Sequence, residues 1–291
     1  MDYLLQSDDF SERIRSRYVS MSDSQRILAR YLIENVDTAA FLTAGKVGTA
    51  VGVSESTVVR FASALGYPGW PELQQVLADI VKAKLSTINR LKHTASSESS
   101  VVAQTVMSTD LDNLKKTMDE IKSDVFERVV ELLSNARTIY VLGLRSARSL
   151  ALFCQFYLQV AGRAVKIVPQ GDSSIFEELS YATSEDIVLA ISFPRYTNLT
   201  VKGFRYAKDT GARTIALTDS EVSPLAQIAD ISLYARTGID SFTESFIAPL
   251  SLINAIVTAV GRRDEAKTIA RLEKFEEICS QNEVYWTPRN E

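Results

Sequence analysis

The fold of the N-terminal part of this chain follows from one stretch, Ala50-Val51-Gly52-Val53-Ser54-Glu55-Ser56-Thr57-Val58-Val59-Arg60-Phe61. Gly52 can take the left-handed backbone that ends a helix sharply, and Ser54 is a residue type that caps the next helix. Val58 and Phe61 are then expected on the inward face of that second helix. Two short helices joined in this way are typical of a helix-turn-helix, whose second helix enters a groove of DNA.

The candidate DNA contacts lie at the start of this second helix. We expect Thr57 and Arg60 to reach base edges, where the sequence of DNA is read, and Ser54 and Ser56 to contact phosphates, which position the protein. The alternative is that these residues only cap the helix and form its solvated outer face.

The residues around this stretch predict an all-α domain over residues 1–85. A helix is expected over residues 22–36, because apolar residues recur there at the spacing of one helical face. A second helix, capped by Thr43, leads into the stretch above. After a turn at residues 67–71, a long amphipathic helix completes the domain.

Residues 86–104 are expected to form a linker. Around His93-Thr94-Ala95-Ser96-Ser97-Glu98-Ser99-Ser100, small polar residues replace apolar ones. Such a segment has little apolar surface to offset the entropy lost when a chain is ordered.

Residues 105–285 predict an α/β domain. Short runs rich in β-branched residues alternate there with helix-like segments, which is typical of a mostly parallel sheet with helices on both faces. Ligands of such sheets bind beyond the carboxyl ends of the strands. The five expected strands are residues 138–142, 165–168, 186–191, 213–217 and 230–234.

Two loops at predicted strand ends carry candidate anion-binding residues. The loop after the first strand holds Arg145 and Ser146, and the loop after the third holds Ser192, Arg195 and Thr197. Guanidinium groups, hydroxyls and the free amides of helix N-termini all favour phosphate or carboxylate. Together the loops predict one shared anion site. The alternative for each is a capped loop with a solvated arginine.

Two further motifs are weaker candidates. Glu244 follows Ser241 by three residues, which fits a capping box better than a catalytic carboxylate. Thr218-Asp219-Ser220 is accounted for by a helix cap near Pro224.

Charge and cysteine content favour a cytoplasmic protein. The 291 residues carry a net charge of −4; residues 1–92 hold eleven Lys/Arg against ten Asp/Glu, or +1, which leaves −5 for the rest. This weak tilt does not predict DNA binding, which depends on the pattern. Cys154 and Cys279 lack metal-ligand spacing and are expected as reduced thiols. Neither a signal peptide nor a membrane span is expected, because the N-terminus is acidic and the apolar run 246–260 is interrupted and short. No metal and no cofactor are expected either.

Taken together, these motifs resemble the RpiR family of bacterial transcriptional regulators, which join a helix-turn-helix to a sugar isomerase (SIS) domain that binds phosphosugars. The resemblance covers residues 22–278 and is carried mainly by residues 53–61, 143–146 and 192–196. It implies that Ser/Thr-rich loops after the first strands hold the phosphate. The residues implied for this role are Ser146, Ser192, Thr197 and Tyr196.

The sequence departs from the family's loops at two places. Arg145 stands where many SIS loops have a second glycine, and Pro194-Arg195 stands where they have a serine and a glycine. Both changes remove small residues that let a backbone approach phosphate closely. The ligand is therefore expected to be held by side chains more than by amides, or to differ from a simple hexose phosphate.

Three functions fit these patterns. The favoured one is a regulator that reads operator DNA as a homodimer, or as a tetramer, under the control of a phosphosugar or related anion. The second is a sugar-phosphate isomerase with an accessory domain, but the single His93 lies in the linker, and Glu177, Glu178 and Glu244 form no recognisable acid–base pair. The third is a scaffold or DNA-architectural protein, which the net negative charge disfavours.

Overall fold

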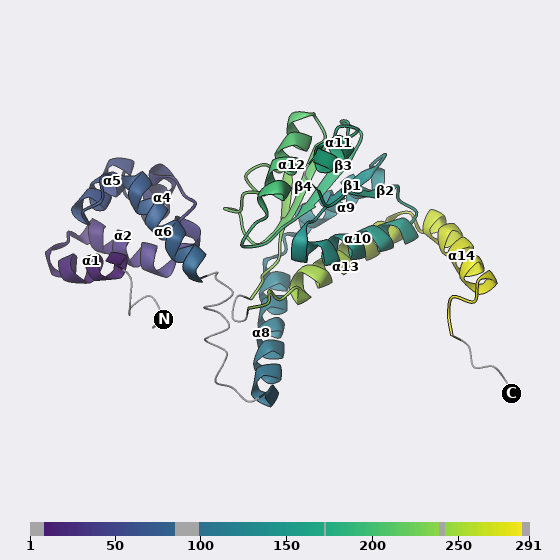
Figure 1. Cartoon of the computed structure of the whole chain (residues 1–291), viewed down its shortest axis with the longest axis horizontal. Coiled ribbons are helices and arrows are strands. Elements are labelled where there is room, and N and C mark those ends of the chain that lie inside the picture. The colour runs from purple at the N-terminus through teal and green to yellow at the C-terminus, as the bar shows by residue number, and fades with distance from the viewer. Residues whose placement is uncertain (1–8, 85–98, 172, 239–241, 287–291) are drawn as a thin grey trace. The chain divides into compact units, whose positions relative to one another are not determined.

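The computed structural model describes residues 9–84, 99–171, 173–238 and 242–286 of the chain. Contacts between residues divide it into a helical unit, within Met1–Ser96, and a sheet unit, within Ser97–Ile239 and Thr243–Glu291 (Figure 1). His93 and Ser241 lie outside the described residues.

In its described residues the helical unit is built from helices, as expected. One helix was expected over residues 22–36, and the structure has two. The break lies at Asn35, whose backbone angles, φ −124° and ψ 33°, are not helical, and whose side-chain amide donates to the Tyr31 carbonyl at 3.0 Å. The elements are α1 (Asp9–Arg17), the 3-10 turn η2 (Tyr18–Ser20), α2 (Asp23–Glu34), α3 (Val36–Ala39), α4 (Ala44–Val51), α5 (Glu55–Ala64) and α6 (Trp70–Lys84).

The turn between α4 and α5 has the predicted chemistry. Gly52 has φ 75° and ends α4, and the Ser54 hydroxyl accepts a hydrogen bond from the Thr57 N–H at 3.3 Å. Thr43 caps α4 in the same way through the Lys46 N–H, at 3.3 Å. The predicted helix-turn-helix is confirmed.

The inward face of α5 is fixed by the core of the helical unit. Val58, Phe61 and Ala62 are completely buried there, in one cluster with residues of α2 and α6. Trp70, at the start of α6, is also buried, and its indole N–H donates to the Leu42 carbonyl at 3.2 Å. This packing determines which side of α5 faces solvent.

The sheet unit contains a five-stranded parallel sheet in the order β2-β1-β3-β4-β5, which confirms the predicted fold class. The chain passes from β1 to β2 on one side and to β3 on the other, so the winding reverses between β1 and β3. Ligands of doubly wound sheets bind at such a switch point. The strands are β1 (Ile139–Leu142), β2 (Val165–Ile167), β3 (Ile187–Ile191), β4 (Arg213–Thr218) and β5 (Ile231–Tyr234).

Helices cover both faces of the sheet (Figure 1). Ile139 and Val141 of β1 enter a core formed with α9, α10 and α13, whereas Tyr140 and Leu142 enter a core formed with α11 and α12. This alternation follows from the two-residue repeat of a strand. The helices of the unit are α8 (Ser99–Glu120), α9 (Ser123–Asn135), the 3-10 turn η3 (Arg145–Ala147), α10 (Arg148–Val160), α11 (Ser173–Leu179), α12 (Asn198–Asp209), α13 (Ile247–Arg263) and α14 (Glu265–Gln281).

Helix α8 begins at Ser99 and therefore takes up the last residues of the range 86–104, which was expected to be a linker. The residues before it, 85–98, lie outside the described part of the chain. None of the helices in the described residues combines the length and apolar character that a membrane crossing requires.

Candidate functional site

The four predicted DNA contacts form one connected cluster at the N-terminus of α5. The Ser54 hydroxyl lies 2.9 Å from that of Ser56 and 2.8 Å from that of Thr57, and Arg60 Nη2 donates to Thr57 Oγ1 at 3.4 Å. Ser54, Ser56 and Arg60 are exposed, and Thr57 is half-buried. Hydroxyls and a guanidinium at a helix N-terminus suit contact with an anionic backbone, since the helix dipole adds positive potential there.

Two arginines of α1 support the other end of α5. Arg13 Nη1 donates to the Leu65 carbonyl at 3.1 Å, and Arg17 donates to the Ala64 carbonyl. The Arg13 guanidinium also lies 4.8 Å from the centre of the Tyr67 ring. Cations at a helix C-terminus satisfy carbonyls that have no partner within the helix. Neither arginine was predicted to have this role, and the only signal in the sequence is their spacing of four residues.

The two predicted anion loops follow β1 and β3, and so lie at the switch point of the sheet. Arg145 and Arg195 are exposed and have positive φ angles of 54° and 69°. Non-glycine residues with positive φ store strain, on the order of 1–3 kcal/mol each. Such strain gathers at ligand sites, where the surrounding structure holds it in place.

Ser146 does not cap the helix that follows it. Helix α10 has Ala147 as N-cap and no side-chain cap, and the Ser146 hydroxyl instead donates to Glu244 Oε2 at 3.1 Å. The expected capping box with Glu244 is wrong, because α13 begins only at Ile247. Glu244 therefore lies at the loop after β1, a placement that no pattern in the sequence predicted.

The residues of the β3 loop occupy different environments. Ser192 is buried at the end of β3, where its N–H donates to the Leu217 carbonyl of β4 at 3.2 Å. Thr197 is the N-cap residue of α12, but its side chain makes no cap hydrogen bond. Its hydroxyl is therefore not used to satisfy the first amides of α12.

Tyr196 ties this loop to the end of β4. Its hydroxyl donates to Asp219 Oδ1 at 2.7 Å, and Asp219 also accepts from the hydroxyls of Thr218 and Ser220, at 3.1 and 3.0 Å. Burial, together with the Asp219 carboxylate, raises the pKa of Tyr196 far above its usual value. Asp219 thus anchors the loop, in place of the helix cap expected for residues 218–220.

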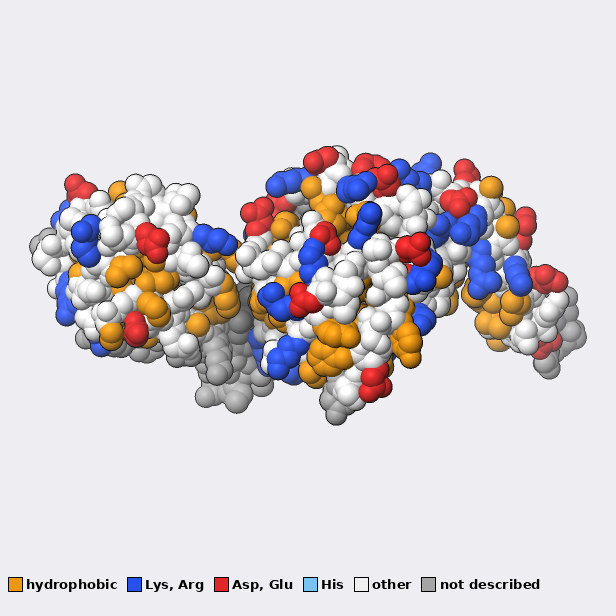
Figure 2. Space-filling view, turned by 90° about the horizontal axis from the view of Figure 1, so that it is seen from above, with side chains coloured by type: hydrophobic (Ala, Val, Ile, Leu, Met, Phe, Trp, Pro, Cys, Tyr) orange, Lys and Arg blue, Asp and Glu red, His pale blue; other side chains and the backbone are white. Residues whose placement is uncertain are grey.

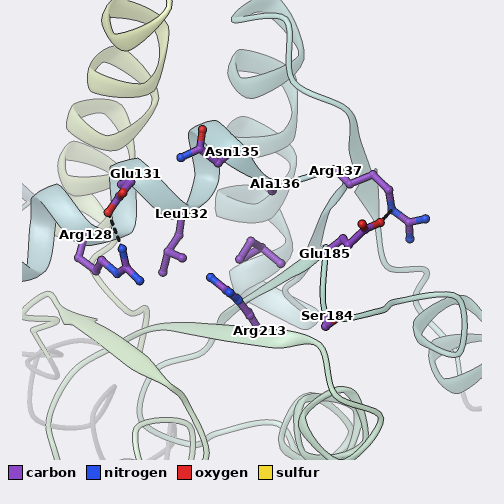
Figure 3. Close-up of a pocket in the computed structure, with 10 residues that line it drawn as sticks. Arg128, Glu131, Leu132, Asn135, Ala136, Arg137, Ser184, Glu185 and Arg213 are labelled. Carbon is purple, nitrogen blue, oxygen red and sulfur yellow. Dashed lines mark hydrogen bonds and ion pairs between the residues drawn. The ribbon is translucent and has the colours of Figure 1, made fainter.

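A cavity of about 630 Å³ lies at the opposite edge of the sheet, where β1, β3 and β4 begin (Figure 3). Two of its arginines are engaged by carboxylates: Arg128 pairs with Glu131 at 2.5 Å, and Arg137 lies 3.7 Å from Glu185. Parallel sheets bind ligands at the carboxyl ends of strands, and this cavity lies at the other edge, away from the loops after β1 and β3.

In the part of the chain that the structure describes, no three His, Cys, Asp or Glu side chains gather as metal ligands do. Cys154 and Cys279 are both buried free thiols, and burial raises the pKa of Cys154 to about 12. Of the carboxylates available to an isomerase, Glu178 pairs with Lys166 at 3.0 Å and Glu244 accepts from Ser146.

Comparison with known proteins matches both units. Residues 9–84 match the family described as helix-turn-helix domain, rpiR family, and residues 132–259 match the SIS domain. The HTH-type transcriptional regulator HexR of Pseudomonas aeruginosa is 28% identical over 263 residues, which cover 87% of this chain and 89% of HexR. An uncharacterized HTH-type transcriptional regulator of Caldanaerobacter subterraneus is 25% identical over 280 residues, 93% of this chain and 97% of that protein.

Solved structures similar to this chain include those of two regulators. The sugar isomerase domain of an RpiR transcription factor from Sphaerobacter thermophilus has a TM-score of 0.58 at 27% identity, covering 60% of this chain and 98% of that domain. NanR of Vibrio vulnificus, solved as a complex with ManNAc-6P, has a TM-score of 0.65 at 19% identity, covering 94% of this chain and 98% of NanR. At this identity the likeness to NanR concerns the fold.

Proposed function

This chain belongs to the rpiR family of helix-turn-helix proteins with a SIS domain, and from that premise we propose that it is a transcriptional regulator whose affinity for operator DNA is set by a small anionic metabolite. The observation that carries the proposal is the joining of an exposed helix-turn-helix to a sheet whose switch-point loops hold hydroxyls and arginines. Its relatives are named as transcriptional regulators, and we infer regulation in the cytoplasm, not catalysis, for this chain.

The N-terminus of α5 is proposed to read DNA. Thr57 and Arg60 are proposed to contact base edges, and Ser54 and Ser56 to contact phosphates. The support is that the outer side of α5 presents these groups while Val58 and Phe61 occupy the core. In Figure 2, basic and acidic side chains are interspersed over the visible face of each unit. Such a distribution favours local reading over non-specific attraction of DNA.

Arg60→Ala should weaken operator binding about 5- to 150-fold, equivalent to about 1–3 kcal/mol, because a bidentate contact with a base edge is lost. The melting temperature should stay unchanged, since Arg60 is exposed and its contact with Thr57 is long, at 3.4 Å. The measurement is a gel-shift titration on DNA that the full chain selects from random duplexes.

Arg60→Lys is the matched control. Lysine keeps the charge but lacks the planar fork, so discrimination between operator and random DNA should fall while affinity for random DNA is retained. Operator affinity that is equal in the wild type and in Arg60→Ala would contradict the assignment of α5 as the reading helix.

The ligand is proposed to bind over the loops after β1 and β3. Arg145 and Arg195 would provide charge there, and Ser146, Ser192 and Thr197 would provide hydroxyls, with Tyr196 positioning the second loop through Asp219. Strained arginines at a switch point and an unused N-cap hydroxyl support this placement. NanR, which shares the fold, is solved with ManNAc-6P, and a phosphosugar or a related anion is the class that these groups suit.

Ser192→Ala should abolish the thermal stabilisation that a ligand gives the wild type. At about 100 times its Kd, a ligand adds about 2.7 kcal/mol to folding, a rise on the order of 5–10 °C for a unit of this size. The measurement is a thermal-shift screen with phosphosugars, amino sugars and acidic metabolites. Ser184→Ala, which alters the cavity at the opposite edge, should keep the full shift. The reverse pattern would move the site to that edge.

Two copies are proposed to bind one operator, or four as paired dimers, because a single small reading helix contributes few base contacts. Apolar side chains available for pairing are exposed on the sheet unit: Met107 and Leu111 of α8 are 67% and 68% exposed, and Phe156 of α10 is 48% exposed. Phe156 also lines a cavity of about 720 Å³ between α10 and α14. Sedimentation of the complex with DNA gives the number of copies.

A further inference from the structure

Glu244 accepts the hydrogen bond of the Ser146 hydroxyl, a group that the proposed anion site needs. The Ser146 O–H, 3.1 Å from Glu244 Oε2, is a hydrogen bond between residues 98 positions apart, and Glu244 is half-buried. A hydroxyl has one proton to donate, so Ser146 cannot donate to this carboxylate and to a bound anion at the same time. A phosphate oxygen on Ser146 would also lie within roughly 6 Å of the carboxylate, where like charges repel.

The residue next to Glu244 is bound to α8. The Ser245 hydroxyl donates to Asp110 Oδ1, and it also lies 3.4 Å from the Ile247 N–H at the start of α13. Because Ser245 is the next residue, a change in the position of Glu244 would also change the contact of Ser245 with α8.

The chain that leaves β5 is bound to the same helix. The Arg236 N–H donates to Thr117 Oγ1 at 2.8 Å, and its guanidinium makes a two-pronged pair with Glu120, at 2.9 and 2.6 Å. Gly238 approaches α8 so closely that an added Cβ would lie 2.9 Å from Asn113 Nδ2. Helix α8 is thus held at several points by residues on either side of the short range 239–241, which lies outside the described residues.

We propose that the Ser146 hydroxyl donates its hydrogen bond either to Glu244 or to a bound anion, and that this exchange acts on α8 through the contact between Ser245 and Asp110. The inference rests on the proposed function and adds the regulation of its site. In the free protein the Ser146 hydroxyl donates to Glu244, and the Ser245 hydroxyl donates to Asp110 of α8. An anion displaces the Glu244 carboxylate, and the neighbouring contact with α8 changes with it. Helix α8 follows the helical unit along the chain. A ligand can therefore select between two states, one in which α8 keeps its contact with Ser245 and one in which that contact has changed.

The first test measures affinity for inorganic phosphate by calorimetry on the full chain. Glu244→Gln keeps an acceptor for Ser146 but removes the charge, so phosphate should bind about five- to tenfold more tightly than in the wild type. The matched control is Glu185→Gln, the same charge change at the opposite edge of the sheet, which should alter the Kd by less than about twofold. Equal phosphate affinity in the wild type and Glu244→Gln would overturn the inference.

The second test measures operator affinity with and without saturating phosphate, with ionic strength held constant by chloride because DNA binding falls with salt. In the wild type the ratio of the two affinities should be at least about fivefold, within the usual range of allosteric coupling. Asp110→Ala and Ser245→Ala should each reduce that ratio below about twofold while phosphate binds at least as tightly as in the wild type, because the contact with α8 no longer has to change when it binds. Asp112→Ala, an exposed residue on the same helix, is the matched control and should keep the full ratio.

The outcomes separate the two proposals. A wild type that binds no phosphate would overturn both the proposed ligand site and this inference. A wild type that responds to phosphate, with Asp110→Ala and Ser245→Ala responding equally, would overturn only the path through α8. A loss of response in Asp112→Ala as large as in Asp110→Ala would overturn it too, because the effect would then belong to the whole helix.

Discussion

Gly48→Ala should destabilise the helical unit by about 3 kcal/mol and abolish operator binding, because the added methyl group would overlap backbone atoms, which cannot move aside as a side chain can. An added Cβ would lie 2.6 Å from the Val53 carbonyl oxygen and 3.3 Å from the Ser54 carbonyl carbon, both in the turn that positions α5. Relief requires α4 and α5 to separate. In an open helix the same change would instead stabilise, by up to about 1 kcal/mol.

Urea denaturation followed by tryptophan fluorescence measures this effect in the helical unit. The chain has two tryptophans: Trp70 is buried in that unit, whereas Trp286 is 87% exposed and should report little. Gly45→Ala is the matched control, three residues earlier in α4. There the added Cβ would meet only the end of the Glu55 side chain, whose carboxylate oxygen would lie at 3.2 Å and can move away. A Gly48→Ala protein as stable as Gly45→Ala would show that the α4–α5 turn is not close-packed.

Arg137→Met should destabilise the sheet unit by about 3 kcal/mol at pH 7, because it leaves a buried carboxylate without its cation. Asp186 is completely buried at the start of β3, where it accepts from Arg137 Nε at 2.9 Å and from the Thr183 N–H at 2.8 Å. Burial alone would raise the pKa of Asp186, but the bonds from Arg137 and Thr183 outweigh it and hold the pKa below its usual value.

The pH dependence of this loss has a definite sign. In the wild type, the depressed pKa of Asp186 contributes stability above the pKa of an unfolded aspartate, about 3.9, and this contribution is lost as pH falls through the folded value. In Arg137→Met the bonds from Thr183 remain but the cation is lost, so the pKa of Asp186 should rise from its wild-type value and the charged carboxylate should cost stability at pH 7. That cost is relieved as the group takes up a proton. The difference between the two proteins should therefore shrink from pH 7 to pH 4.

Calorimetric melting of the full chain at both pH values measures the difference. Arg128→Met is the matched control from the same cavity (Figure 3). Arg128 also makes a close ion pair, at 2.5 Å, but its partner Glu131 is 40% exposed, so its loss should cost less than about 1 kcal/mol. If both variants lost the same free energy of unfolding, the burial of Asp186 would not be what makes its ion pair important for stability.

The helix-turn-helix could be predicted because its signals act within one helical turn. Ser54 caps α5 through an amide three residues away, and Gly52 needs only its own backbone freedom to end α4. The break at Asn35 is also local. It was missed because the apolar repeat of residues 22–36 continues through it, and periodicity does not register the non-helical backbone angles of Asn35 or the bond from its side chain to the Tyr31 carbonyl.

The sequence was enough to predict which two loops form the candidate ligand site, but not the backbone angles and hydrogen bonds within them. That the loops after β1 and β3 lie together follows from parallel strands whose carboxyl ends share one edge. The positive φ of Arg145 and Arg195 runs against the preference of arginine, so no residue rule anticipates it. The bond from Tyr196 to Asp219 joins two loops that are neighbours only because β4 pairs with β3.

What this sequence determined by itself is the succession of its five strands, the turn that presents Arg60, and the edge of the sheet at which the two candidate loops lie. Each of these depends on interactions over a few residues or on a repeating pattern. The tertiary structure alone decided that Arg13 and Arg17 support the end of α5, that Glu244 holds Ser146, and that Ser245 holds α8. Those contacts join residues 47 to 135 positions apart, and a pairing over such distances exists only once packing has brought the two segments together.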